Sequence, residues 1–179
     1  MSDPSSVKSC LQTLSSGDFS KINAQQILDQ CKQLNKLSQN DPLSPELVDA
    51  FAGVGVAFAK VWDLKDANKI DINKQDSVAT QVFSELTRIV INLSEHSSRL
   101  ASAMFSAGVV NCVSLDLGAW STGFESKLRD ENTPVLKFTL QFLRIIALIA
   151  RFEELNYQVS LQTRGLNLPA VVKLFLKNG

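Results

Sequence analysis

The sequence has little of the chemistry that most enzymes need. Its 179 residues include one histidine, His96, and three cysteines that form no Cys-x-x-Cys pair. A single histidine excludes most histidine-based metal sites and leaves only one imidazole as a candidate general base. Phosphate-binding glycine loops, zinc-ligand spacings and paired catalytic carboxylate motifs are also missing. We therefore expect no enzymatic activity, no cofactor and no metal site.

An excess of either charge is missing as well. Lys and Arg together number 18, as do Asp and Glu, so the formal net charge is zero. Because binding to nucleic acid or to a membrane surface usually needs a clear basic excess, we expect neither partner. The scattered cysteines, and an opening "MSDPSSVKSC" without an apolar core, predict reduced thiols in the cytoplasm or the nucleus.

Strand signals are sparse, because polar and apolar residues do not alternate over long segments. Apolar residues instead recur with helical spacing, and the fold class is predicted to be all-α. The expected long helices are at about 24–38, 77–93 and 133–150, with Ser44 and Pro45 starting a shorter one. We expect a disordered tail at 1–6 and a single domain at 7–179, with polar linkers at 65–76 and 120–132.

Two segments follow the same order of a long helix, a second helix, a glycine and a third helix, and the first third of the chain is a weaker copy of it. The glycines are Gly53, Gly108 and Gly165, which lie 55 and 57 residues apart. This near-constant spacing predicts a repeat protein, in which successive units stack and bury a continuous core. The repeats are predicted at about 24–64, 77–119 and 133–178.

Polar residues inside the long helices repeat with a period of 56. The first set, Gln25, Asp29, Lys32 and Lys36, is spaced by four, three and four residues, which is one helical face. Shifting it by 56, and by 56 again, gives polar residues at eleven of the twelve positions, and we call these positions the polar ladder. The candidate partner-binding residues among them are Lys32, Lys36, Gln81, Glu85, Arg88, Asn92, Lys137, Gln141 and Arg144.

The polar ladder carries two acids and five bases, a local charge of +3 on a neutral chain. Arginine and amide side chains hydrogen-bond carbonyls and carboxylates, so such a face suits an acidic or extended peptide. A plain solvated surface would also be polar, and that interpretation stays open. The third long helix favours a binding face, because "LQFLRIIALIAR" is apolar on most sides and should pack between neighbours.

Two segments resemble armadillo repeats, in which a long helix ending like "LxNLs" is followed by a first helix, a glycine and a second helix. "RIVINLSEHSSRLASAMFSAGVVNCVSLDL" follows that order, and so does "RIIALIARFEELNYQVSLQTRGLNLPAVVKLFL" with Leu148 in place of the asparagine. The period of 56 exceeds the roughly 40 to 47 residues usual for such repeats. The spacing and "LQFL" are similar to the ataxin-ten family, and armadillo proteins that stimulate small GTPases are the second candidate.

The resemblance implies a right-handed armadillo-like helical solenoid of about three divergent repeats, with the long helices along a concave face. It further implies a non-catalytic scaffold that binds a partner protein or extended peptide there, with Asn92 at the family's asparagine position. The alternatives are a regulator of a small GTPase and an oligomerisation domain. Because the sequence ends in the apolar "LPAVVKLFLKNG", we expect either further repeats beyond Gly179 or a homo-oligomeric contact at this end.

Overall fold

The computed structural model describes residues 3–16, 24–40, 42–66, 70–127, 134–164 and 166. Within these ranges the chain is all-helical, as predicted, and contains no strand. The helices are α1 (Pro4–Ser16), α2 (Ala24–Ser38), α3 (Pro45–Phe51), α4 (Val54–Asp66), α5 (Val78–His96), α6 (Ser98–Ser106), α7 (Val109–Lys127), α8 (Pro134–Ala150) and α9 (Glu153–Gln162).

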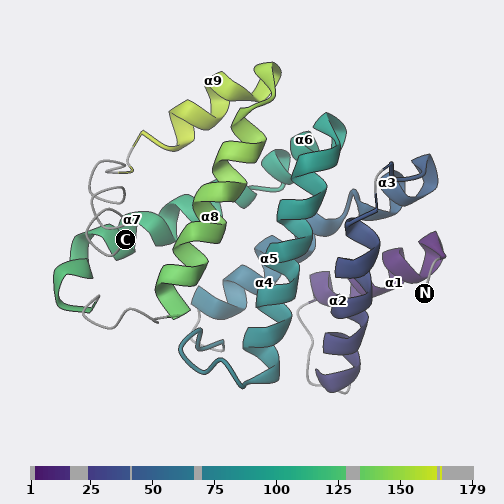
Figure 1. Cartoon of the computed structure of the whole chain (residues 1–179), viewed down its shortest axis with the longest axis horizontal. Helices are drawn as coiled ribbons and strands as arrows, with labels where there is room; N and C mark the ends of the chain where they lie inside the picture. The colour runs from purple at the N-terminus through teal and green to yellow at the C-terminus, as the bar shows by residue number, and fades with distance from the viewer. Residues whose placement is uncertain are drawn as a thin grey trace.

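The helices form two layers (Figure 1). The long helices α2, α5 and α8 lie side by side in one layer, with α5 packed against both of the others. The second layer lies behind them, where α4 packs against α1 and α7. The shorter helices α3, α6 and α9 lie toward the upper end of the view. The long helices α2 and α5 therefore each contact the helix three places further along the chain, which is compatible with a helical repeat.

Local signals explain where several helices begin. The hydroxyl oxygens of Ser44, Ser77 and Ser97 each accept a hydrogen bond from a backbone N–H three residues further on, which satisfies a donor of the first turn. Pro45 stands at the start of α3, where its missing N–H costs nothing. Gly108 adopts a φ of +83°, the left-handed geometry that lets α6 end and α7 start after a sharp turn.

A cluster of aromatic side chains joins the two layers. Phe58 and Trp62 on α4 contact Phe83 on α5, and Phe83 contacts Phe138 and Phe142 on α8, with ring centroids 5.3 to 6.5 Å apart. These five side chains are buried, and Phe83 is fully so. Burial of rings of this size is a major source of stabilisation. The cluster fixes α5 between α4 and α8, and so sets the position of the polar ladder.

Two expected boundaries are wrong. The helix α1 begins at Pro4, so residues 4–6 do not belong to a disordered tail. The carboxylate of Asp3 accepts the N–H of Ser5 at 3.2 Å, which caps this end. The helix α7 continues to Lys127, through the first part of the expected linker 120–132. No proline interrupts that segment before Pro134, and polar residues alone do not end a helix. The last expected helix, after Gly165, lies outside the described residues.

Candidate binding surface

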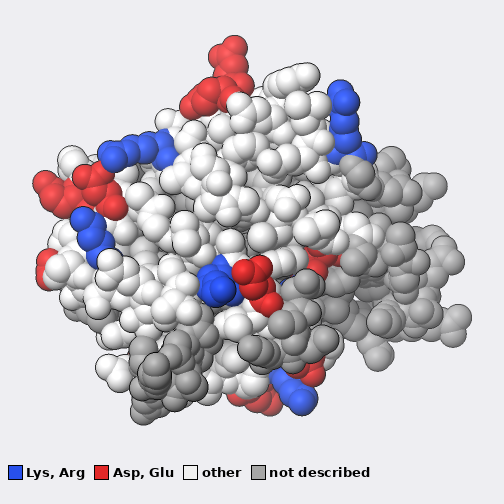
Figure 2. All heavy atoms as spheres, turned by 180° about the vertical axis from the view of Figure 1, so that it is seen from behind, with Lys and Arg blue, Asp and Glu red and all other residues white. Residues whose placement is uncertain are grey.

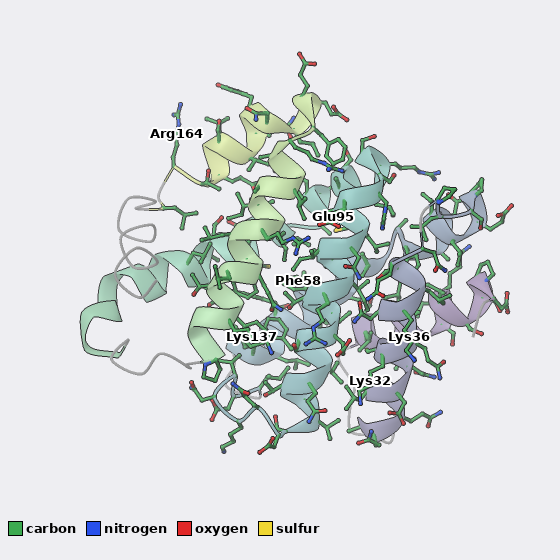
Figure 3. All side chains as sticks on the ribbon, viewed as in Figure 1. Lys32, Lys36, Phe58, Glu95, Lys137 and Arg164 are labelled. Atoms are coloured by element: carbon green, nitrogen blue, oxygen red, sulfur yellow. The ribbon has the colours of Figure 1, made fainter. Side chains whose placement is uncertain are left out.

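The polar ladder lies on three adjacent helices. Lys32 and Lys36 lie along α2, and Lys137 lies near the start of α8, on either side of α5 (Figure 3). The five basic ladder residues are exposed, whereas the four remaining candidates are half-buried. The exposed residues are Lys32, Lys36, Arg88, Lys137 and Arg144, and the half-buried ones are Gln81, Glu85, Asn92 and Gln141.

Asn92 connects α5 to α2. Its Nδ2 donates hydrogen bonds to Asn35 Oδ1 and to Ser38 Oγ, both at 2.9 Å. Ser38 is fully buried and Asn92 half-buried, so these bonds lie between the helices. An amide nitrogen has two hydrogens to donate, and both have an acceptor within the protein. The amide nitrogen of Asn92 therefore holds α2 and α5 together, whereas the armadillo resemblance implied a role in binding a peptide.

Glu85 continues this network toward the surface. Its Oε2 accepts a hydrogen bond from Asn35 Nδ2 at 2.7 Å, and its Oε1 lies 2.9 Å from Arg88 Nη1. The Glu85 side chain is 12% exposed and that of Arg88 is 44% exposed. Both carboxylate oxygens thus have partners within the protein. The negative charge of Glu85 is compensated before any ligand arrives.

Two arginines of the last long helix and its end reach the C-terminal part of α5. Arg144 forms an ion pair with Glu95, and Arg151 donates to the backbone carbonyls of Glu95 and Ser94. A cation at the C-terminal end of a helix is favourable, because the last carbonyls lack helical partners and the helix dipole is negative there. Arg144 is 59% exposed despite its partner, so it stays accessible to solvent.

A shallow pocket lies where α5 and α8 face each other. Its volume is about 160 Å³, and it includes four candidates from the sequence: Gln81, Glu85, Arg88 and Lys137. Gln75, Thr80, Ser84, Pro134 and Phe138 complete the lining. Gln141 also lies on α8, but its Oε1 is buried and has no hydrogen-bond partner among the described residues. Ladder residues of two helices therefore meet in one place, whereas Lys32 and Lys36 lie apart from it on α2.

Sequence reasoning missed Asn35, Glu95 and Arg151. A signal for two of them is present, because a further step of three residues along the ladder leads from Asn92 to Glu95 and from Leu148 to Arg151. These two are 56 residues apart and form one of the observed contacts. Asn35 lies one residue before the ladder position Lys36, so a fixed period could not select it.

The opposite face of the molecule differs in charge. Seen from behind, it shows few charged side chains, and most of them lie near its edges (Figure 2). By contrast, among the described residues Lys32, Lys36 and Lys137 are exposed cations of the ladder that have no ion-pair partner. Uncompensated charge raises the local concentration of ligands of opposite sign. Lys32, Lys36 and Lys137 make the ladder face a candidate surface for recognising an anionic partner.

Comparisons and simple chemical searches add no assignment. No protein-family model, curated protein or solved structure matches the chain. Among the described residues, no three His, Cys, Asp or Glu side chains are grouped so that they could hold a metal ion. In the same residues no single helix is long and apolar enough to cross a membrane, although α6 and the first part of α7 together meet that test with a bend of 64°.

Proposed function

We propose that this chain is a non-catalytic scaffold that binds a partner protein or an extended peptide along the face of α2, α5 and α8. The helices are taken to form a right-handed armadillo-like solenoid of about three divergent repeats. The observation that carries the proposal is the row of adjacent long helices with polar ladder residues on each of them. The sequence predicts the same order of helices and a glycine in 24–64, 77–119 and 133–178, which are the three proposed repeats.

The charge distribution supports a peptide partner. Exposed cations on each of the three adjacent helices suit the carboxylate and carbonyl groups of an extended peptide. The lysines on α2 and α8 have no ion-pair partner among the described residues, so binding would not first have to break a salt bridge there. Arg88 and Arg144 each have one partner and are largely exposed.

The test is a pulldown with the wild-type chain and with the charge reversals Arg88→Glu and Arg144→Glu. We expect any partner recovered by the wild type to be reduced at least tenfold by the double variant. Lys60→Glu is the matched control, because Lys60 is an exposed lysine on α4 in the other layer. The substituted positions are 44% and 59% exposed, so the introduced carboxylates can stay solvated, and we expect the variants to fold with some loss of stability from repulsion by Glu85 and Glu95. Circular dichroism and urea unfolding check this.

Unchanged recovery of the partner by the folded double variant would eliminate the face of α2, α5 and α8 as the binding surface. A sedimentation coefficient that rises with protein concentration would support the oligomerisation alternative instead. The apolar segment 168–179, at which that contact is expected, lies outside the described residues.

A further inference from the structure

The pocket between α5 and α8 has an unbalanced charge. It contains one carboxylate, Glu85, and two cations, Arg88 and Lys137. The charge of Glu85 is already compensated by Arg88, and its other carboxylate oxygen accepts a hydrogen bond from the amide of Asn35. Lys137 is exposed and has no ion-pair partner among the described residues. One positive charge is therefore left at the pocket, and a single anionic group would balance it.

Other polar groups of the pocket suit a carboxylate. Gln75, Gln81 and Ser84 line it, and their amides and hydroxyl are hydrogen-bond donors, with one hydrogen of the Gln81 amide already donated to the backbone carbonyl of Asp76 at 3.4 Å. The hydroxyl of Thr80 is already used, since it donates to the backbone carbonyl of Asp71 at 2.8 Å. A volume of about 160 Å³ accepts one side chain and is far smaller than the roughly 300 to 1,000 Å³ typical of cofactor sites. The size favours a side chain of a partner over a free cofactor.

An apolar group lies beside this cation on α8. Leu140 follows Lys137 by three residues and precedes Arg144 by four, so the three share one helical face. Lys137 and Leu140 differ by a rise of about 4.5 Å along the helix axis, which one or two residues of an extended peptide can span. All three side chains are exposed. Leu140 thus lies between two cations on this face. This arrangement matches a peptide in which an apolar residue is flanked by acidic residues.

The geometry points to an acidic peptide segment as the partner. One carboxylate side chain of the segment occupies the α5–α8 pocket at Lys137, and an adjacent apolar side chain packs on Leu140. This inference rests on the proposed peptide-binding function and names the chemistry of that partner. It also separates the roles of the polar and apolar residues on this face: Lys137 and Leu140 contact the ligand, whereas Asn92 and Glu85 join α5 to α2.

Fluorescence anisotropy with two defined peptides tests this. The probe is a fluorescein-labelled hexapeptide of the sequence Glu-Leu-Glu-Glu-Leu-Glu, and its control is the same peptide with glutamine in place of each glutamate. We expect the glutamate peptide to bind at least tenfold more tightly than the glutamine peptide. The preference should weaken between 50 and 500 mM salt, where screening of exposed charges increases (on the order of 14 Å to 4 Å for the Debye length).

Substitutions at Lys137 and Leu140 test where on the protein the peptide binds. Lys137→Glu should weaken binding of the glutamate peptide at least tenfold, Lys137→Arg should preserve it, and Lys60→Glu should not change it. Leu140→Ser should weaken the glutamate and the glutamine peptide by a similar factor, because it removes only the apolar contact. Equal affinity for both peptides, unaltered binding by folded Lys137→Glu, or binding of neither peptide at millimolar concentration would each overturn the inference.

The two proposals fail in different ways. One outcome is a partner that is lost with Arg88→Glu and Arg144→Glu, is retained with Lys137→Glu and is not displaced by the glutamate peptide. This outcome overturns the proposed binding of an acidic peptide in the pocket, but not the proposed binding face of α2, α5 and α8. Retention of the partner by all of these folded variants overturns the proposed binding face as well. Urea unfolding of every variant shows whether it remains folded at the concentration used for binding.

Discussion

Asn92 of α5 and Asn35 of α2 lie 57 residues apart in the sequence and are joined by a hydrogen bond of 2.9 Å between their side chains. Asn35 Nδ2 donates a hydrogen bond of 2.7 Å to Glu85 Oε2, and Asn92 Nδ2 also donates to the buried hydroxyl of Ser38. Polar groups at this depth depend on one another, because water no longer satisfies them fully. The network therefore sets the register of α2 against α5.

Asn92→Ala should destabilise the fold by about 1–3 kcal/mol, because Asn35 Oδ1 and Ser38 Oγ would lose their donor in a part-buried contact. Urea unfolding measures this as a lower midpoint. The control is a double-mutant cycle with Asn35→Ala, in which we expect a coupling of about 0.5–3 kcal/mol. Independent, additive effects would show that the two amides do not cooperate.

Gly55→Ala should destabilise by about 1–3 kcal/mol through overpacking. A Cβ at Gly55 would lie 2.8 Å from the Cβ of Ala107 and 3.0 Å from the Cα of Met104, where α4 approaches α6. Gly118 on α7 is the matched control, because a Cβ there meets nothing within 4 Å. Since glycine weakens a helix, Gly118→Ala should stabilise by about 0.5–1 kcal/mol. Equal thermal unfolding of the two variants would contradict the close approach.

Lys65→Met should cost about 3–5 kcal/mol, because it removes the ammonium that pairs with the largely buried carboxylate of Asp116. The two side chains form an ion pair between α4 and α7, each only 10% exposed, and the ammonium lies 3.8 Å from the centre of the Trp62 ring. The double variant Lys65→Met with Asp116→Leu should recover most of the loss, since apolar pairs often replace buried ion pairs. Chemical denaturation of the single and double variants decides this.

Cys112 should react slowly with a thiol reagent in the native protein. Burial, followed by the nearby carboxylates of Asp63 and Asp116, raises the pKa of the Cys112 thiol to about 11. Because the thiolate is the reactive form, modification at pH 8 should speed up strongly on unfolding in urea. A raised folded-state pKa stabilises below the unfolded pKa of about 8.5, and this contribution is lost as the pH rises toward 11. Cys112→Ala should therefore reduce the alkaline loss of stability, and equal rates of native and unfolded labelling would argue against burial of the thiol.

Helix positions could be predicted from the sequence because their signals are local. Ser44 and Pro45 start α3 as expected, and Ala24–Ser38 has the expected bounds, since capping and apolar spacing act within a few residues. The extension of α7 to Lys127 was missed, because a polar segment without proline is compatible with both a linker and an exposed helix.

The roles of the ladder residues could not be separated in the same way. A period of 56 selected Asn92, Arg88 and Lys137 alike, although Asn92 is bonded across a helix contact and Lys137 is exposed and without an ion-pair partner among the residues described. Asn35, which accepts a hydrogen bond from Asn92, lies one residue before the ladder position Lys36, so the period of 56 does not select it. Side chains around the same helix differ in what they meet, and this depends on how the neighbouring helix is rotated and shifted.

The sequence by itself determined that the chain is helical, where most helices begin, and which polar residues share a helical face, because these properties depend on spacings of a few residues. Only the tertiary structure decided which of those residues bond to one another and which remain open. Packing of the aromatic cluster around Phe83 brings α5 between α2 and α8. That placement brings Asn35 of α2 to Glu85 and leaves Lys137 beside the pocket without an ion-pair partner among the described residues, because contacts between distant segments form only once their apolar faces are buried together.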